Sequence, residues 1–306
     1  MCKTQFYWTR RRALQLGAAL AVVPALSYSK DNMMLTRPIP TSGEELPVIG
    51  LGTYNVFDVA STPANIDARR AIVESLVEKG ASLIDSSPMY NRAEDVVGEI
   101  IKTSGNRDKL FLATKVWTNG KAAGERQMRA SSERMNAGVM DLMQIHNLRD
   151  TGEHLATIRD WQAEGRIRYN GVTHYRAGAL DDLEAAMKQH KPEFVQINYS
   201  LMERESDKRI LPLAKDLGIA VLINRPFVEG RLFRAVGGLP LPDWAREFAE
   251  SWGQFFLKFI ISHPAVTCVI PATSKIRHMV DNLGAGFGSL PDDKTRQRMA
   301  DHIASL

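Results

Sequence analysis

The chain has 306 residues, of which 44% are hydrophobic and 24% are charged. This is the composition of an ordinary globular protein, and it excludes a disordered chain, a collagen-like fibre and a coiled coil. The net charge of +4 comes from four basic residues near the N-terminus, Lys3, Arg10, Arg11 and Arg12. The rest of the chain carries 35 basic and 35 acidic residues, so it has no positive surplus for binding a nucleic acid.

The first 27 residues have the pattern of an export signal. Arginines at positions 10–12 precede an apolar stretch, residues 14–26, that is too short to cross a membrane as a helix. The paired arginines before this stretch resemble a bacterial twin-arginine signal. We therefore expect residues 1–27 to be a signal peptide for the twin-arginine export machinery, and residues 28–306 to form one domain in the periplasm. The alternatives are a basic tail that is never cleaved and an uncleaved membrane anchor.

After residue 40, short apolar runs alternate with longer amphipathic segments. The runs predicted as strands are residues 47–52, 82–85, 110–115, 140–146, 167–173, 194–199, 220–224 and 267–271. The segments predicted as helices are residues 64–79, 92–103, 122–135, 152–164, 177–190, 206–217, 244–262, 275–283 and 291–303.

Eight strand-then-helix units predict a parallel (β/α)8 TIM barrel. The alternative is an open doubly wound sheet, which is disfavoured because Gly50-Leu51-Gly52-Thr53 lacks the third glycine of a dinucleotide-binding turn. Residues 35–38 and 45–46 flank a turn at 41–43, and we expect this β-hairpin to cap the bottom of the barrel. Cys268 lies in an apolar run and is predicted to be a buried structural thiol.

Four reactive side chains follow three neighbouring predicted strands. Asp85 ends the second strand and Tyr90 follows it by five residues, whereas Lys115 and His146 end the third and fourth strands. The active site of such a barrel lies at the carboxyl ends of its strands, so we expect these side chains to converge. Taken singly, each has an ordinary explanation, such as a helix cap or a solvated lysine.

Together the four side chains form a coherent acid catalyst. A phenol normally has a pKa of about 10, and a neighbouring ammonium group stabilises its phenolate. A carboxylate keeps that ammonium charged and in position, and an imidazole can donate a hydrogen bond that orients a carbonyl oxygen. The set therefore predicts protonation of a carbonyl oxygen while a hydride donor attacks the carbon.

Four longer motifs extend this pattern. They are Pro47-Val48-Ile49-Gly50-Leu51-Gly52-Thr53, Ile84-Asp85-Ser86-Ser87-Pro88-Met89-Tyr90, Ala113-Thr114-Lys115 and Leu142-Met143-Gln144-Ile145-His146-Asn147. On these motifs, residues 46–282 resemble the aldo/keto reductase family. The resemblance implies a catalytic tetrad of Asp85, Tyr90, Lys115 and His146, with Tyr90 as the proton donor. It also implies a monomer that binds NADP(H) across the barrel mouth and interconverts a small carbonyl compound and an alcohol.

The resemblance further implies which residues contact the cofactor and the substrate. The cofactor-binding residues are Gly52, Thr53, Thr173, His174, Gln196, Asn224, Arg225, Pro226, Phe227, Thr273, Lys275, His278 and Asn282, and the substrate pocket contains Tyr54 and Trp117. His174 departs from the usual asparagine, and Asn224 stands where an aromatic residue commonly stacks on the nicotinamide. Arg225 is expected to meet the pyrophosphate and Lys275 the 2′-phosphate, which favours NADP over NAD. No metal site is expected.

Two other functions remain open from the sequence. One is a nicotinamide-binding sensor or partner subunit with little turnover, because Asn224 alters the stacking position. The other is a cofactor-independent lyase or hydrolase that uses Asp85 and His146, although this reading leaves the pattern at Gln196 and at residues 271–282 unexplained.

Overall fold

The computed structural model describes Met1 and residues 33–306. Apart from Met1, the predicted signal peptide at residues 1–27 therefore lies outside the described residues. Eight parallel strands form one sheet in chain order: β3 (Leu51–Gly52), β4 (Leu83–Asp85), β5 (Phe111–Val116), β6 (Met140–His146), β7 (Ile167–His174), β8 (Phe194–Asn198), β9 (Ala220–Asn224) and β10 (Cys268–Val269).

The chain around β3 meets the chain around β10 and closes the sheet into a barrel. Parallel bridges join Ile49 to Val269 and Gly52 to Ala272. A Cβ atom on Gly52 would lie 2.8 Å from the carbonyl oxygen of Ile270, so this closure requires glycine. The predicted (β/α)8 barrel is confirmed.

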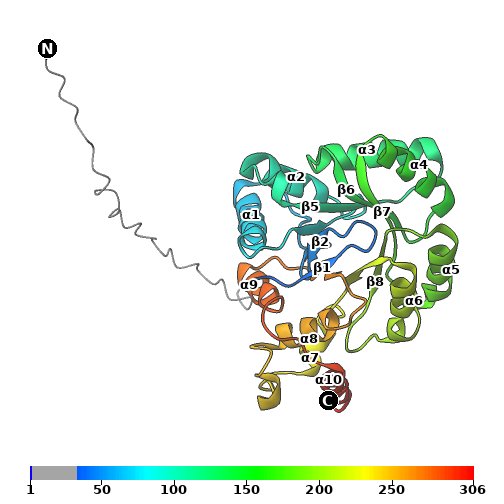
Figure 1. The fold of residues 1–306 in the computed structure, drawn as a ribbon. Coiled ribbons are helices and arrows are strands. Elements are labelled where there is room, and N and C mark those ends of the chain that lie inside the picture. Colours follow the sequence, from blue (N-terminus) through cyan, green and yellow to red (C-terminus); the bar gives the residue numbers. More distant parts are fainter. Residues whose placement is uncertain (2–32) are drawn as a thin grey trace.

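Helices surround the barrel on its outside (Figure 1). They are α1 (Pro63–Glu78), α2 (Ala93–Ser104), α3 (Lys121–Arg134), α4 (Thr151–Ala163), α5 (Leu180–His190), α6 (Ile210–Leu217), α7 (Arg231–Ala235), α8 (Trp252–Ile261), α9 (Ile276–Gly284) and α10 (Asp293–Ala304). Helix α1 illustrates how the sequence sets an element: Thr62 accepts a hydrogen bond from the Asn65 backbone, and Pro63 takes the first helical position. Within residues 33–306, no helix combines the length and apolar character that a membrane span requires.

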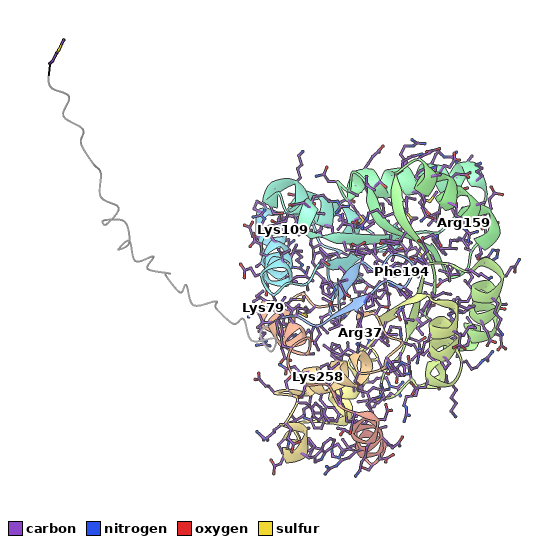
Figure 2. The ribbon with its side chains drawn as sticks, viewed as in Figure 1. Arg37, Lys79, Lys109, Arg159, Phe194 and Lys258 are labelled. Atoms are coloured by element: carbon purple, nitrogen blue, oxygen red, sulfur yellow. The ribbon has the colours of Figure 1, made fainter. Side chains whose placement is uncertain are left out.

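The predicted hairpin is present and covers one end of the barrel. Strands β1 (Thr36–Pro38) and β2 (Glu45–Pro47) pair antiparallel, and Figure 1 shows them crossing the centre of the ring of strands. Ile39 and Leu46 of the hairpin pack in one buried cluster with the first residues of β4, β5, β8, β9 and β10. Cys268 belongs to this cluster, which confirms it as a buried thiol. In Figure 2, Phe194 lies inside the barrel and Arg159 on its outer surface.

The structure corrects several predicted boundaries. The single helix predicted at 244–262 is wrong, because a 3-10 turn at Asp243–Ala245 is separated from α8 by the extended residue Ser251 (φ −146°, ψ 163°). The side chain of Ser251 accepts from the Gln254 backbone and so caps a new helix. The strand predicted at 47–52 is split between β2 and β3, and the segments 177–190 and 206–217 begin as 3-10 turns.

Candidate active site

A buried ion pair joins the ends of β4 and β5. The Nζ atom of Lys115 lies 2.6 Å from Oδ2 of Asp85, and it also donates to the carbonyl oxygen of Ser86 at 2.7 Å. The side chains of Lys115 and Asp85 are only 1% and 4% exposed. Burial opposes the charged ammonium, but the Asp85 carboxylate, assisted by the neighbouring Tyr90, more than offsets this effect, so the pKa of Lys115 is raised. The predicted pairing of these two residues is confirmed.

Tyr90 lies directly beside this pair. The ammonium of Lys115 is 5.2 Å from the centre of the Tyr90 ring. Burial raises the pKa of Tyr90, and the opposing effect of Lys115 does not cancel that increase. Lys115 thus lowers the pKa of the phenol relative to burial alone, as expected. The phenol nevertheless stays protonated at neutral pH, which is the form that a proton donor needs.

His146 completes the group from the end of β6. Its ring is 6.1 Å from the Tyr90 ring, edge-on at 90°, and Nδ1 lies 3.0 Å from the Oγ atom of Ser87. Burial, assisted by the charges of Lys115 and His174, lowers the pKa of His146 to about 3. The imidazole is therefore neutral at physiological pH. The structure brings all four residues of the predicted tetrad together.

A second layer of polar side chains lies beneath the tetrad. Oδ1 of Asp85 accepts hydrogen bonds from Nε2 of Gln196 at 2.9 Å and from Nε2 of Gln144 at 3.1 Å. The hydroxyl of Thr173 lies 2.9 Å from the backbone carbonyl oxygen of Gln196 and 3.1 Å from its Oε1, and it donates its single proton to one of these two oxygens. Gln196 and Thr173, which the sequence predicts as cofactor contacts, thus lie in the network around Asp85. Sequence reasoning missed Gln144, although a glutamine inside an apolar strand was a usable signal.

The residues at the end of β3 hold this strand in the barrel. Thr53 is fully buried; its hydroxyl donates to the carbonyl oxygen of Asp85 at 3.0 Å and forms a second hydrogen bond with the hydroxyl of Ser86, also at 3.0 Å. Together with the closure at Gly52, these bonds fix β3 against β4. Tyr54, predicted to line the substrate pocket, is exposed, with its ring 5.0 Å from that of Tyr90.

Trp117 lies just beyond β5, near the start of the loop that leads to α3. The guanidinium of Arg149 stacks on its indole at 4.7 Å. A cavity of about 390 Å³ is lined by Asn147, Thr151 and His174 together with residues of α5 (Leu180–His190), and none of the four tetrad residues lines it. The cavity therefore does not form a substrate pocket at the tetrad.

The segment after β9 combines polar and packed positions. Oδ1 of Asn224 is buried with no hydrogen-bond partner among the described residues. Arg225 has a left-handed backbone (φ 50°) and pairs with Glu229 at 2.8 Å, while Pro226 is buried. The ring of Phe227 packs on Phe233 at 4.9 Å, so it belongs to the aromatic cluster under α7 and α8.

The segment after β10 leads into the N-terminus of α9. Thr273 is buried and accepts from the backbone of Lys275 at 3.1 Å, which shapes the turn into the helix. Lys275 occupies the N-cap position and is exposed, as is His278 in the first turn. Asn282 is buried near the end of the helix. A lysine at the positive end of a helix suits an anion. Within residues 33–306, no cluster of His, Cys, Asp and Glu side chains is arranged to hold a metal ion.

Comparison with known proteins gives concordant matches. The family model described as "Aldo/keto reductase family" matches residues 48–300. Methylglyoxal reductase YeaE of Escherichia coli (strain K12) is 30% identical over 261 residues, covering 81% of this chain and 89% of that protein. Aldo-keto reductase YhdN of Bacillus subtilis (strain 168) is 29% identical over 212 residues, and the match covers 63% of this chain but only 62% of that protein. A crystal structure of an aldo-keto reductase from Klebsiella pneumoniae in complex with NADPH has a TM-score of 0.74 at 24% identity, covering 88% of this chain and 96% of that one.

Proposed function

The chain belongs to the aldo/keto reductase family, and from that premise we propose that it is an NAD(P)H-dependent oxidoreductase that reduces an aldehyde or ketone to an alcohol. The observation that carries the proposal is the buried Lys115–Asp85 pair beside Tyr90, at the carboxyl ends of neighbouring strands. A barrel of this kind places its reacting groups on that face.

The proposed chemistry is a paired transfer to the carbonyl group. When bound, the nicotinamide cofactor supplies a hydride to the carbonyl carbon. Tyr90 donates its proton to the carbonyl oxygen, and Lys115 stabilises the phenolate that results. Asp85 keeps Lys115 charged and in place. His146, neutral because it is buried, donates a hydrogen bond that orients the carbonyl oxygen.

The residues at the mouth fit a nicotinamide dinucleotide. The unpartnered Oδ1 of Asn224 can accept a hydrogen bond from an amide, and the next residue, Arg225, carries a positive charge that is paired with the exposed Glu229. Lys275 places a second positive charge at the start of α9, about where a 2′-phosphate would bind to the helix end. We therefore propose NADP(H) as the preferred cofactor.

We propose a small carbonyl compound as the substrate. The relative YeaE is named a methylglyoxal reductase. In this chain, Tyr54 supplies an exposed aromatic ring beside Tyr90, and Trp117 follows the end of β5 directly. A short aldehyde or dicarbonyl compound fits this combination, so methylglyoxal and glyoxal are the first compounds to test.

The experiment is a titration of the full chain with NADPH and with NADH, followed by fluorescence. The consumption of NADPH with a panel of small aldehydes and ketones is then measured. We expect tighter binding of NADPH and carbonyl-dependent oxidation of it. Absence of binding by either nucleotide would overturn the oxidoreductase proposal. Turnover without a cofactor would instead support the lyase or hydrolase reading.

One feature favours a second candidate function. Asn224 replaces the aromatic residue that commonly stacks on the nicotinamide, so the ring is less firmly held. A sensor or partner subunit that binds the cofactor without reducing a carbonyl would follow if NADPH binds but no compound in the panel is turned over.

For the N-terminus, we propose that residues 1–27 direct export to the periplasm by the twin-arginine route, and that the protein acts there as a monomer. Replacing Arg10 and Arg11 by lysine keeps the charge but removes the pair that this machinery recognises. Cell fractionation should then find the variant in the cytoplasm. Unchanged export of the variant would exclude the twin-arginine route.

A further inference from the structure

We propose that Ser87 is a positioning residue for His146: its hydroxyl donates to Nδ1 and so keeps the imidazole proton on Nε2, the nitrogen available to the carbonyl oxygen. The proposal rests on the proposed function only in the role that it gives to Nε2. It begins from one contact, in which Oγ of Ser87 lies 3.0 Å from Nδ1 of His146, with both residues buried.

The direction of this hydrogen bond follows from the other partner of Ser87. Its Oγ accepts a hydrogen bond from the backbone N–H of Met89 at 3.2 Å. A serine hydroxyl has a single proton to donate, and among the described residues Nδ1 is the one acceptor within its reach. If Nδ1 carried the proton instead, the hydroxyl would keep an unpaired donor in a fully buried site, which is costly. The network therefore favours Nδ1 as the acceptor.

The position of the ring proton matters because the imidazole of His146 is neutral. Since burial keeps the pKa of His146 at about 3, the imidazole carries one proton at neutral pH. With Nδ1 as the acceptor, that proton is on Nε2. Within the described part of the chain Nε2 has no hydrogen-bond partner, and it is not among the polar atoms sealed from solvent. A carbonyl oxygen can therefore reach it as an acceptor, whereas a bare Nε2 would repel that oxygen.

A purely structural role for Ser87 is the rival explanation. Its carbonyl oxygen accepts from the backbone of Tyr90 at 2.9 Å, so Ser87 also belongs to the turn that carries Tyr90. In that case the hydroxyl would only brace the turn through Met89. The two explanations differ in what the loss of the hydroxyl does to the ring of His146.

The first test is kinetic and compares three variants of the full chain. Ser87→Ala should lower kcat about tenfold, the size expected for one lost orienting hydrogen bond, and NADPH affinity should change less than about twofold. Ser87→Thr keeps a hydroxyl and should recover kcat to within about threefold of wild type. Ser206→Ala is the matched control, because this buried serine donates to the Asn198 carbonyl at 3.2 Å, has no side-chain hydrogen bond to the tetrad among the described residues, and should leave kcat unchanged.

The second test reads the tautomer directly and needs no turnover. Protein labelled with ¹⁵N in its histidines gives ring-nitrogen signals, and His146→Gln identifies those of His146. We expect wild type to carry the proton on Nε2 with Nδ1 bare and hydrogen-bonded at neutral pH, and Ser87→Ala to shift the Nδ1 signal as it loses its donor.

Each outcome decides between the explanations. A wild-type proton on Nδ1 would overturn the proposal, even if Ser87→Ala failed to fold. A loss of kcat in Ser87→Ala with unchanged ring signals would assign Ser87 to the turn and would also overturn it. A protein that reduces no carbonyl compound would refute the proposed function, while the ring signals would still report whether Ser87 sets the tautomer.

Discussion

The buried pair of Lys115 and Asp85 yields a sharp prediction for stability. Lys115→Met removes the cation and leaves Asp85 buried, with only the two amide donors from Gln144 and Gln196 on its other oxygen. Loss of one partner of a buried ion pair costs about 3–5 kcal/mol. The two remaining donors still compensate part of the charge, so we expect about 3 kcal/mol.

Removing the carboxylate instead of the ammonium is expected to cost a similar amount of stability. Asp85→Asn leaves the buried Lys115 cation without a counter-charge, and its hydrogen-bond acceptors, the Ser86 carbonyl among them, are then neutral. The double variant removes both charges, so its cost should fall short of the summed single costs by about 2 kcal/mol or more, within the range seen for contacting groups.

Urea unfolding at pH 7 measures all four proteins, and equal slopes would show that the unfolded states are comparable. Tyr90→Phe serves as a control, because it removes a neighbouring hydroxyl without removing a charge. Single costs that simply add in the double variant would refute the reasoning, since the pair would then contribute no interaction of its own.

Three further predictions concern charge. The pKa of His146 is lowered by burial from 6.5 to about 3, so between these pH values the unfolded chain binds a proton that the folded chain does not. The free energy of unfolding should therefore decrease by about 1.4 kcal/mol for each pH unit below 6.5. In His146→Gln, the free energy of unfolding should depend less steeply on pH in this acid range. Burial also lowers the pKa of Lys258 from 10.5 to about 8, so this group should increase the free energy of unfolding as the pH rises from 8 to 10.5. Denaturant unfolding of Lys258→Met should show no such increase over that range. Lys275→Ala should raise the Kd for NADPH about tenfold more than that for NADH, and equal losses in a fluorescence titration would exclude a contact with the 2′-phosphate.

The barrel was predictable because its signals are local. Each buried strand is a short apolar run, and the polar residues that end neighbouring runs must meet on one face of a parallel barrel. The sequence alone therefore predicts that Asp85, Lys115 and His146 lie close together. The hairpin followed in the same way, from two short segments around a turn.

The finer arrangement was not predictable, because it depends on where side chains point. Spacing gave no indication that Gln196 faces Asp85, that Gln144 shares the same carboxylate, or that Ser87 meets His146. The helix predicted at 244–262 failed for a related reason. Aromatic residues at helical spacing masked the N-cap at Ser251, which separates two independently packed segments.

The most direct test of the central claim is a turnover with NADPH that carries deuterium in both positions at C4 of its nicotinamide. The product alcohol is examined by mass spectrometry for wild type and for Tyr90→Phe. We expect one deuterium on the former carbonyl carbon in wild type, and a rate about a hundredfold to ten-thousandfold lower in Tyr90→Phe with NADPH affinity retained. A product without deuterium, or a Tyr90→Phe rate within a few-fold of wild type, would contradict this claim.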